Sequence, residues 1–573
     1  MCISIVLYVA QTYSYNLQTT LLNVLAERMD IGKLTGTLYL DGSPLPKSFR
    51  WRMGYVQQQD IHLPSQTVRE ALQMTAHLRR PPSLSTDEKN AYVEEVLDML
   101  GMQDISDALI GVPGAGLNLE QRKRVSMGIE LAAKPDILLL DEPTSGLDGQ
   151  SAISLVQLLK KLSRSGQTIL CTIHQPAAAV IEAFDNLILL AKGGRVTYQG
   201  PLGEHSSTAL KYFSQHVEAC DPKRNPAEYL LDVVGAGSRS NVTADWAQIW
   251  SESSECRVQD AKLHDLKNEP TAEQSRPQLY ATPLSHQFAI VLRRTWLWYW
   301  REPEYFSAKL WMNVANGLLN GLTFLNIPNS QQGAFDRVYT IFLSFLMGPP
   351  LGLSMEPRFT TFRDIFVYRE RASRSYHWIV FVMSSIVIEL PFTLITALIY
   401  WLLWYFPAGL QTDPTHAGYA LLCYWLFSIF TVSLGYLIAA WMPNLNASLM
   451  ANGFFFMFVN TFAGTLTARE KTPSGWSWYF NVSPLYYLAE GLTTNALYGH
   501  ELGCTPSEAT VFHAPANDTC ISYAGSFLQS ATGYLVNPDA TGACDYCRYS
   551  IGQEYVSGEV GFVEASANHC IPR

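Results

Sequence analysis

The sequence predicts an α/β domain followed by an all-α domain that crosses a membrane about five or six times. Residues 1–285 have the composition of a soluble domain, whereas residues 305–468 carry long apolar runs. Charged residues make up 16% of the chain, against roughly 25% in a typical soluble protein. A chain of 573 residues is too long for one core. Its net charge of −10 gives no reason to expect nucleic-acid binding.

Shifts of composition predict five segments. Residues 1–16 form an atypical N-terminus, which is apolar at first but lacks the basic start of a signal peptide. Residues 17–234 alternate strand-like and helix-like stretches, as an α/β domain does. Residues 235–283 are rich in Gly, Ser and charge and predict a linker. Residues 284–468 predict the membrane domain, and residues 469–573 an extracellular Cys-rich loop with an atypical C-terminus.

Periodicity predicts the elements of the first domain. Strands are expected at residues 36–41, 52–57, 138–140 and 168–173, and the last two are short and apolar, as in a parallel sheet covered on both faces. Helical periodicity covers residues 20–28 and 88–100, and Gly101 ends the second of these helices.

The second domain begins with a stretch at residues 284–300 that combines three Trp and one Tyr with neighbouring arginines, a mixture that suits a helix lying at the cytosolic membrane surface. The predicted spans follow at residues 307–327, 335–356, 378–406, 417–441 and 448–468. Five arginines in residues 357–377 place that loop in the cytosol, and the absence of Lys and Arg from residues 407–416 places that loop outside. Alternation then puts the chain after residue 468 outside.

The cysteines agree with an external C-terminal segment. Five of the ten cysteines lie there: Cys504, Cys520, Cys544, Cys547 and Cys570. Such clustering favours disulfides in an oxidising compartment, with the pairing left open. Cys544 and Cys547 form a CxxC that suits half of a zinc site, but no second ligand pair stands at a suitable spacing. Asn517 is the expected glycosylation site.

The apolar strand at residues 138–140 ends in two adjacent carboxylates, Asp141 and Glu142. A P-loop ATPase needs this arrangement, because the first carboxylate holds Mg²⁺ on the ATP phosphates and the second polarises the attacking water. His174 ends the next strand and suits a switch that senses the γ-phosphate. Gln58 ends an earlier strand, from which it can reach Mg²⁺ and the water; it is chosen by register, with Gln57 and Gln59 as alternatives. These residues predict catalytic roles for Glu142, His174 and Gln58.

Residues 117–121 precede a predicted helix and resemble, in their place along the chain, the signature segment of ATP-binding cassette proteins, whose helix N-terminus faces the γ-phosphate bound by a second subunit. Small residues let bare backbone N–H groups approach the phosphate there. Leu117, Asn118, Leu119, Glu120 and Gln121 occupy these positions instead. Glu120 would bring negative charge close to the phosphate. We therefore expect this segment to contact nucleotide as a catalytically impaired signature.

Residues 19–25 resemble the helix that follows a phosphate-binding loop, with Thr19 and Thr20 at its start. The pattern G-x-x-x-x-G-K-[ST] then places Thr12 and Leu17 at the glycine positions and Gln18 at the lysine position. Thr19 can still bind Mg²⁺, but the residues that hold the phosphates are absent. We expect weak ATP binding and little or no hydrolysis by this chain.

The order of these motifs, with residues 225–229, 369–371 and 388–391, resembles the fungal pleiotropic drug resistance transporters of the ATP-binding cassette (ABC) G subfamily. The degenerate residues 117–121 beside an intact Asp141 and Glu142 resemble the second, C-terminal repeat, truncated at both ends. The resemblance implies an ABC nucleotide-binding domain and an ABC-2 membrane domain. Its implied ligands are ATP and Mg²⁺. It assigns Thr19, Asp141 and Gln58 to the metal, Glu142 to catalysis, His174 to the switch and Asp148 to the D-loop.

The resemblance implies part of an ATP-driven exporter of hydrophobic drugs, toxins or secondary metabolites, in a multi-pass protein of the plasma membrane with a cytosolic nucleotide-binding domain. Its partner would be the missing first repeat or another ABC half, besides membrane lipid and a small hydrophobic substrate. Two alternatives remain: a modulator of an intact transporter or inert pseudogene product, and a half-size lipid or sterol transporter. A homodimer would pair two defective signatures, which disfavours the last.

Overall fold

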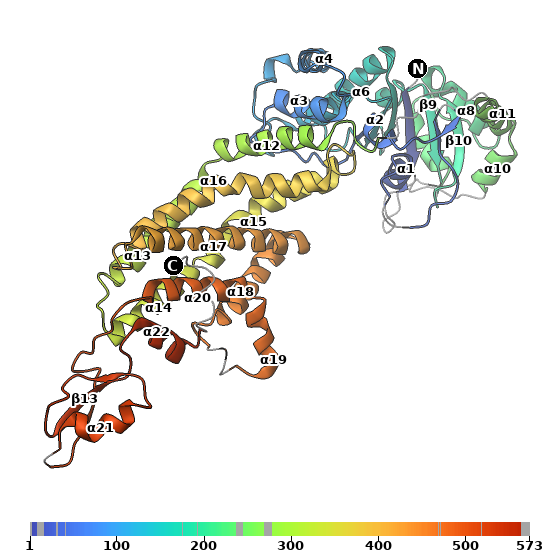
Figure 1. The fold of residues 1–573 in the computed structure, drawn as a ribbon. Coiled ribbons are helices and arrows are strands. Elements are labelled where there is room, and N and C mark those ends of the chain that lie inside the picture. Colours follow the sequence, from blue (N-terminus) through green and yellow to red (C-terminus); the bar gives the residue numbers. More distant parts are fainter. Residues whose placement is uncertain are drawn as a thin grey trace. The chain divides into compact units, whose positions relative to one another are not determined.

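The computed structural model describes residues 3–8, 17–29, 32–40, 42–174, 176–191, 193–235, 244–268, 278–467, 469, 472–516 and 518–562. The chain forms two compact units. The first unit comprises Met1–Trp298 and Asp364–Ser384, and the second comprises Tyr299–Arg363 and Ser385–Arg573. Figure 1 labels their elements.

A six-stranded sheet with the order β10-β9-β1-β8-β7-β4 forms the centre of the first unit (Figure 1). The strands β4, β7, β8, β1 and β9 pair in parallel, and β10 is antiparallel to β9. Their bounds are β1 Ile3–Tyr8, β4 Met53–Val56, β7 Ile137–Asp141, β8 Thr168–Thr172, β9 Asn186–Leu190 and β10 Val196–Pro201. β4 and most of β7 are buried, as the predicted apolar strands require. The predicted α/β class is confirmed.

Helices connect the strands. Their bounds are α1 Leu17–Leu25, α2 Phe49–Arg52, α3 Val68–Arg79, α4 Thr86–Met99, α5 Leu119–Leu131, α6 Gly149–Arg164, α7 Ala178–Ile181, α8 Ser207–Ser214 and α9 Pro226–Val233. Short pieces complete the set: β2 Tyr39–Leu40, β3 Ser43–Pro44, β5 Gly111–Val112, β6 Ala115–Gly116, η1 Gln103–Ile105 and η2 Glu204–Ser206. Helix α4 agrees with the prediction for residues 88–100. Ser85 and Glu88 form its capping box, and Gly101 follows its end with φ +62°.

Two segments of the first unit differ from the sequence analysis. Strand β1 lies between β8 and β9, so the sheet includes part of the segment that we set apart as an atypical N-terminus. Within the expected linker, α10 (Trp246–Glu252) and α11 (Ser254–Asn268) are helical. Trp246 and Trp250 are four residues apart, on one helix face, and pack on aromatic rings of α8 and β10. The compositional prediction of a linker missed this apolar face.

The second unit is largely helical. Its helices are α13 Glu304–Thr323, α14 Gln331–Phe345, α15 Gly348–Ile365, α16 Trp378–Trp404, α17 Pro414–Trp441, α18 Leu445–Thr461, α19 Ser474–Ser477 and α20 Pro484–Leu497. The end of α15, η3 (Phe366–Glu370) and the start of α16 belong to the first unit, as does α12 (Leu284–Arg301) as far as Trp298. By length and composition, three described helices can cross a membrane: Gln331–Glu370, Trp378–Trp404 and Pro414–Trp441. The predicted second span is therefore part of a longer helix, which continues beyond residue 356.

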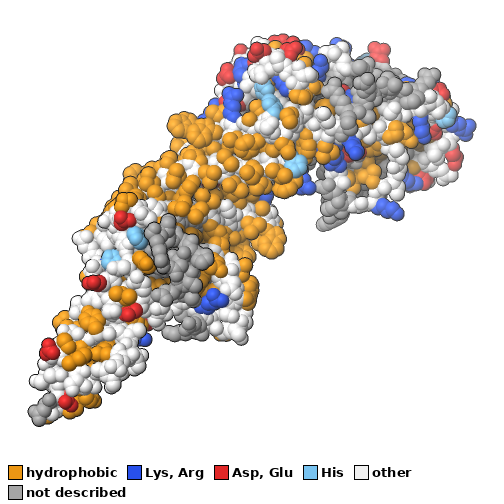
Figure 2. All heavy atoms as spheres, viewed as in Figure 1, with side chains coloured by type: hydrophobic (Ala, Val, Ile, Leu, Met, Phe, Trp, Pro, Cys, Tyr) orange, Lys and Arg blue, Asp and Glu red, His pale blue; other side chains and the backbone are white. Residues whose placement is uncertain are grey.

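Apolar side chains cover much of the helical surface in Figure 2. Large exposed ones on these helices include Trp311, Leu319, Leu437, Met450 and Met457. Contiguous exposed apolar surface of this extent suits a lipid environment. The predicted membrane domain is confirmed as largely helical.

Helix α20 extends the helical core beyond the predicted boundary at residue 468. Leu485, Ala489 and Leu492 are buried in one cluster with residues of α14 and α17. The helical turn η5 (Trp478–Asn481) precedes α20. After α20 come β11 Thr510–His513, α21 Cys520–Leu528, β12 Tyr534–Leu535, β13 Ala543–Cys547, α22 Gly552–Tyr555 and the helical turn η6 Val556–Val560. The strands form a sheet with the order β11-β13-β12.

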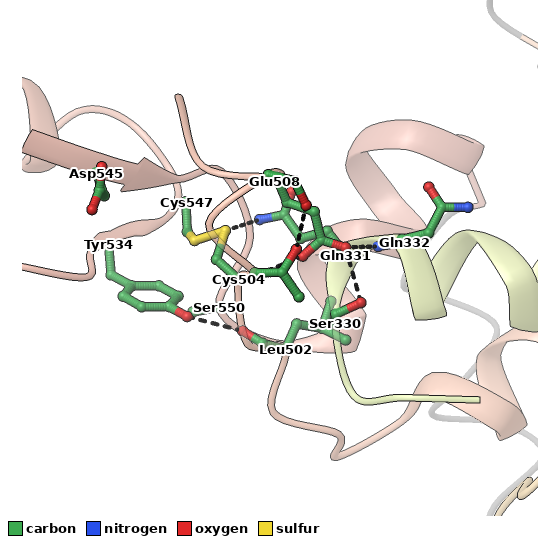
Figure 3. The surroundings of a disulfide bond; sticks show 12 residues. Ser330, Gln331, Gln332, Leu502, Cys504, Glu508, Tyr534, Asp545, Cys547 and Ser550 are labelled. Carbon is green, nitrogen blue, oxygen red and sulfur yellow. Dashed lines mark hydrogen bonds between the residues drawn. A yellow bond between two sulfur atoms is a disulfide. The ribbon is translucent and has the colours of Figure 1, made fainter. Parts of the chain in front are cut away.

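Two disulfides hold the segment around this sheet, Cys504–Cys547 (Figure 3) and Cys520–Cys544. The structure thus assigns Cys544 and Cys547 to disulfides instead of a zinc site. Cys570 and Asn517 lie outside the described residues. Disulfides suit the predicted external side of the membrane.

Candidate nucleotide-binding site

The candidate site lies where β7 and β8 end. Asp141, the last residue of β7, is 3% exposed, and Glu142 follows it with φ +48°. A left-handed backbone is costly for a residue with a β-carbon and is tolerated chiefly at functional sites. The turn aims two neighbouring carboxylates at the carboxyl edge of a parallel sheet, where ligands bind in open α/β folds.

Thr172 connects the two acidic residues. It is the last residue of β8 and pairs in register with Asp141. Its hydroxyl donates a 2.8 Å hydrogen bond to Asp141 Oδ1 and accepts a 3.0 Å bond from the Glu142 backbone N–H. One buried hydroxyl therefore fixes both the Asp141 carboxylate and the turn at Glu142.

Thr19 approaches Asp141 from helix α1. Burial raises the pKa of Asp141, and hydrogen bonds from the Thr172 and Thr19 side chains oppose that rise. Helix α1 packs against β1 and β7, which places its first turn beside the end of β7. Thr20 is half-buried one position further along α1.

Gln58 reaches the same edge from the loop after β4. Its side-chain Nε2 donates a 2.7 Å hydrogen bond to Glu142 Oε2. The structure therefore brings together four residues that the sequence analysis selected: Thr19, Asp141, Glu142 and Gln58. Of the three neighbouring glutamines, Gln57 instead bonds the Tyr368 carbonyl, which supports the choice of Gln58.

Two other selected residues flank this cluster. His174 is exposed two residues beyond the end of β8. Asp148 caps helix α6 by accepting a hydrogen bond from the Ser151 N–H, and its side-chain bond with Ser151 holds the pKa of Asp148 below its usual value. Asp148 thus has a local structural role as well as the D-loop position expected of it.

The residues at the start of α5 bond one another. Asn118 accepts from the Gln121 N–H at 2.8 Å, and Gln121 accepts from the Asn118 N–H at 3.0 Å, which makes a reciprocal capping box. Glu120 pairs with Arg124 one turn later. Leu117 is buried, whereas Leu119 is 44% exposed. Side chains at the start of α5 therefore bond backbone N–H groups that, in an intact signature, are free to bind phosphate.

The loop that joins β1 to α1 holds the position of a phosphate-binding loop. Residues 9–16 lie outside the described part of the chain, as do the side chains of Leu17 and Gln18. The expected glycine and lysine positions are therefore known from the sequence alone.

The Asp141 surroundings fit a magnesium ion that also binds phosphate. Mg²⁺ commonly takes one or two carboxylates and leaves its other positions to water and substrate phosphates. A buried carboxylate beside the Thr19 hydroxyl meets that requirement. Among the described residues, no group of three or more His, Cys, Asp or Glu side chains forms a metal cluster of its own.

The sequence analysis missed Thr172, Lys123 and Asp60. Lys123 on α5 donates a 2.6 Å hydrogen bond to the Gln58 carbonyl and forms a 3.1 Å ion pair with Asp60. Thr172 carried a usable signal, because it is the polar end of an apolar strand two residues before His174. The contacts of Lys123 and Asp60 had no such signal, since they join segments about sixty residues apart.

Comparisons with known proteins agree with both domains. A family model described as ABC transporter matches residues 18–145, and models described as ABC-2 type transporter match residues 286–497 and 174–250. The match to residue 497 agrees with the place of α20 in the helical core.

Among curated proteins, the ABC transporter patM of Penicillium expansum is 56% identical over 524 residues, which cover 91% of this chain and 37% of patM. The Brefeldin A resistance protein of Schizosaccharomyces pombe is 40% identical, over 94% of this chain and 36% of its own length. The chain thus spans little more than a third of these relatives. One solved structure, cbiO1 of Clostridium perfringens, is 24% identical to this chain and covers 38% of it, which is 84% of the cbiO1 chain. Its TM-score of 0.31 is too low to support an argument.

Proposed function

Because this chain belongs to the ABC transporters of the fungal pleiotropic drug resistance type, we propose that it forms one half of an ATP-driven exporter of hydrophobic compounds. Its substrates would be drugs, toxins or secondary metabolites, and its membrane the plasma membrane. Relatives named for multidrug transport and for brefeldin A resistance support this substrate class.

The observation that carries the proposal is the linkage of Gln58, Glu142, Asp141 and Thr172 at one edge of the sheet. Asp141 and Thr19 would hold Mg²⁺ on the phosphates of ATP. Glu142 would accept a proton from the attacking water, Gln58 would orient that water, and His174 would sense the γ-phosphate. Bound Mg²⁺ would neutralise charge that builds up on the phosphates.

The partner in this proposal is another ABC half, such as a first repeat. The start of α5 bonds to itself and bears Glu120, so it would make a poor phosphate contact for a nucleotide held by the partner. The partner's signature would therefore complete the site around Asp141 and Glu142. This pairing supports assignment of the chain to a second repeat.

A test of the proposal co-expresses this chain with the first half of patM in a drug-sensitive yeast. Growth in brefeldin A and other apolar inhibitors measures export. We expect resistance that needs both halves and disappears with Glu142→Gln, while the exposed control Glu95→Gln on α4 retains it. Resistance that survives Glu142→Gln would refute the assigned catalytic role.

Gln18 stands at the position where a phosphate-binding loop has its lysine. This favours a second candidate function, in which the chain modulates an intact transporter. Photolabelling with an azido-ATP analogue separates the two. Magnesium-dependent labelling that Asp141→Asn abolishes would support the exporter half. No labelling, together with altered export by a co-expressed intact transporter, would support the modulator.

A further inference from the structure

A segment that runs from the end of the helix Gln331–Glu370 to the start of α16 belongs to the nucleotide-binding unit. Residues Asp364–Ser384 lie in the first compact unit, with the turn η3 (Phe366–Glu370) at their start. η3 is a π-helix, a geometry frequent at functional sites. On one side, Glu370 pairs with the buried Arg294 of α12 and accepts a hydrogen bond from Tyr376. This pairing anchors η3 on α12.

On the other side, η3 meets the loop after β4. Arg369 Nη1 donates to the Ile61 carbonyl at 3.1 Å and lies 3.3 Å from His62 Nδ1. A guanidinium can only donate. His62 Nδ1 must therefore accept, which leaves the proton of a neutral imidazole on Nε2.

This tautomer continues a directed chain of hydrogen bonds. His62 Nε2 donates to Ser126 Oγ at 2.9 Å, and Ser126 donates to the Asp60 carboxylate. Asp60 pairs with Lys123, and Lys123 donates to the carbonyl of Gln58. The Gln58 side chain then bonds Glu142. The contacts therefore run without a gap from Arg369 on η3 to the carboxylate of Glu142.

We propose that His62 is a positioning residue that couples Arg369 of η3 to the Gln58–Glu142 pair, and that it does so only when neutral. The functional meaning of this coupling rests on the proposed ATPase site, whereas the linkage itself is a property of this chain. Protonation of His62 would remove the side-chain acceptor of Arg369, leave its Nη1 with the Ile61 carbonyl, and place a second positive charge beside the guanidinium. The link would then open at acidic pH.

The surroundings of His62 favour its neutral form. Burial holds the pKa of His62 well below its usual value, and the positive charges of Arg369, Arg122 and Lys123 lower it further, against a raising hydrogen bond from the Arg122 backbone. The acidic groups nearby already have partners. Asp60 pairs with Lys123, and Glu370 with Arg294 and Arg369.

Amide hydrogen exchange of the full chain in lipid nanodiscs, without nucleotide, tests the proposal. The readouts are peptides covering residues 57–63 and 364–376, with rates corrected for intrinsic exchange at pH 7.5 and pH 5.5. His62→Gln can still accept from Arg369 and donate to Ser126, but it does not titrate. His62→Ala and Ser126→Ala break the chain. His77→Gln is the matched control, because His77 bonds Asn90 and lies outside the chain of contacts.

At pH 7.5 we expect exchange of both peptides to rise roughly 3- to 10-fold in His62→Ala and Ser126→Ala, the range set by losing one net hydrogen bond. His62→Gln and His77→Gln should match the unaltered chain. At pH 5.5, His62 binds a proton in states in which the link to Arg369 is open, but not in states in which the link is closed. Protection should therefore fall roughly tenfold in the unaltered chain and in His77→Gln, but not in His62→Gln.

Two outcomes would overturn the proposal: unchanged exchange in His62→Ala, or the same loss of protection at pH 5.5 in His62→Gln. Because no nucleotide is present, a chain that fails to bind ATP still gives a decisive result. Failure of the proposed function and failure of this linkage are thus separate observations.

Discussion

Gln58 Nε2 donates a 2.7 Å hydrogen bond to Glu142 Oε2 across 84 residues of sequence. The pair joins the loop after β4 to the turn after β7, and these strands are parallel neighbours in the sheet. A water that replaced this contact would lie between a hydrogen-bond donor and a carboxylate. That position is the one a hydrolytic water needs.

Thr172→Val should destabilise the first unit by about 1–3 kcal/mol, because it leaves the buried Asp141 carboxylate and the Glu142 N–H without their shared partner. Denaturant-induced unfolding followed by tryptophan fluorescence measures the change. Thr168→Val at the exposed start of the same strand is the control and should change stability little. Equal effects of the two substitutions would contradict the bridging role of Thr172.

The capping box of α5 should behave as one interaction. Asn118→Ala and Gln121→Ala should each destabilise the first turn by about 0.5–2 kcal/mol, and the double variant should cost less than the sum. Exchange rates of the amides at the start of α5 measure these effects. Strict additivity would show that the two residues act independently.

The buried ion pair of Lys309 and Glu389 should be costly to break. Both residues are at most 3% exposed, and Tyr299 and Tyr305 also bond the Glu389 carboxylate. Lys309→Met should destabilise the second unit by about 3–5 kcal/mol because it leaves a buried charge unpaired.

The double variant Lys309→Met with Glu389→Leu should recover most of that loss, since it removes both charges. Thermal unfolding in detergent, followed by solubility after heating, compares the variants. A double variant as unstable as the single one would show that the two side chains are needed for more than their mutual attraction.

Glu508 predicts a pH-sensitive contact in the disulfide-bonded segment. Its carboxylate accepts from Ser330 Oγ and the Gln332 N–H at the start of α14, beside Cys504 (Figure 3). Burial raises the pKa of Glu508, but hydrogen bonds from Thr505, Gln332 and Ser330 outweigh it and hold the pKa below the usual 4.5. The contact is therefore complete above about pH 4.5 and is lost as the pH falls through the lower folded value.

Phosphine reduction of Cys504–Cys547, followed by mass spectrometry, measures this loss. Relative to the internal control Cys520–Cys544, its reduction should accelerate as the pH falls below about 4.5, and not between pH 6 and that value. Glu508→Gln should remove that acceleration. A pH dependence that persists in Glu508→Gln would assign it to another group.

The predictable parts of this chain are those with a local pattern. Residues 88–100 showed the helical periodicity of α4, and Gly101 predicted where that helix ends. Asp141 and Glu142 marked the end of β7. The apolar runs at residues 335–356, 378–406 and 417–441 marked three described helices that can cross a membrane by length and composition, whereas those at residues 307–327 and 448–468 did not. The failures arose where tertiary packing decides, as at Trp246 and Trp250, whose helix looked like a linker by composition. The bond between Gln58 and Glu142 needed the strand order, which no local pattern contains.

Strand β1 has a consequence for how the protein is made. Its partners in the sheet, β8 and β9, begin at Thr168 and Asn186, so more than 150 residues separate it from either. During synthesis, Ile3–Tyr8 must wait until those strands have left the ribosome. Non-local parallel pairing forms slowly because a long loop must close first. The apolar start of the chain is therefore exposed to aggregation through that interval and is a natural client for chaperones that bind nascent apolar segments.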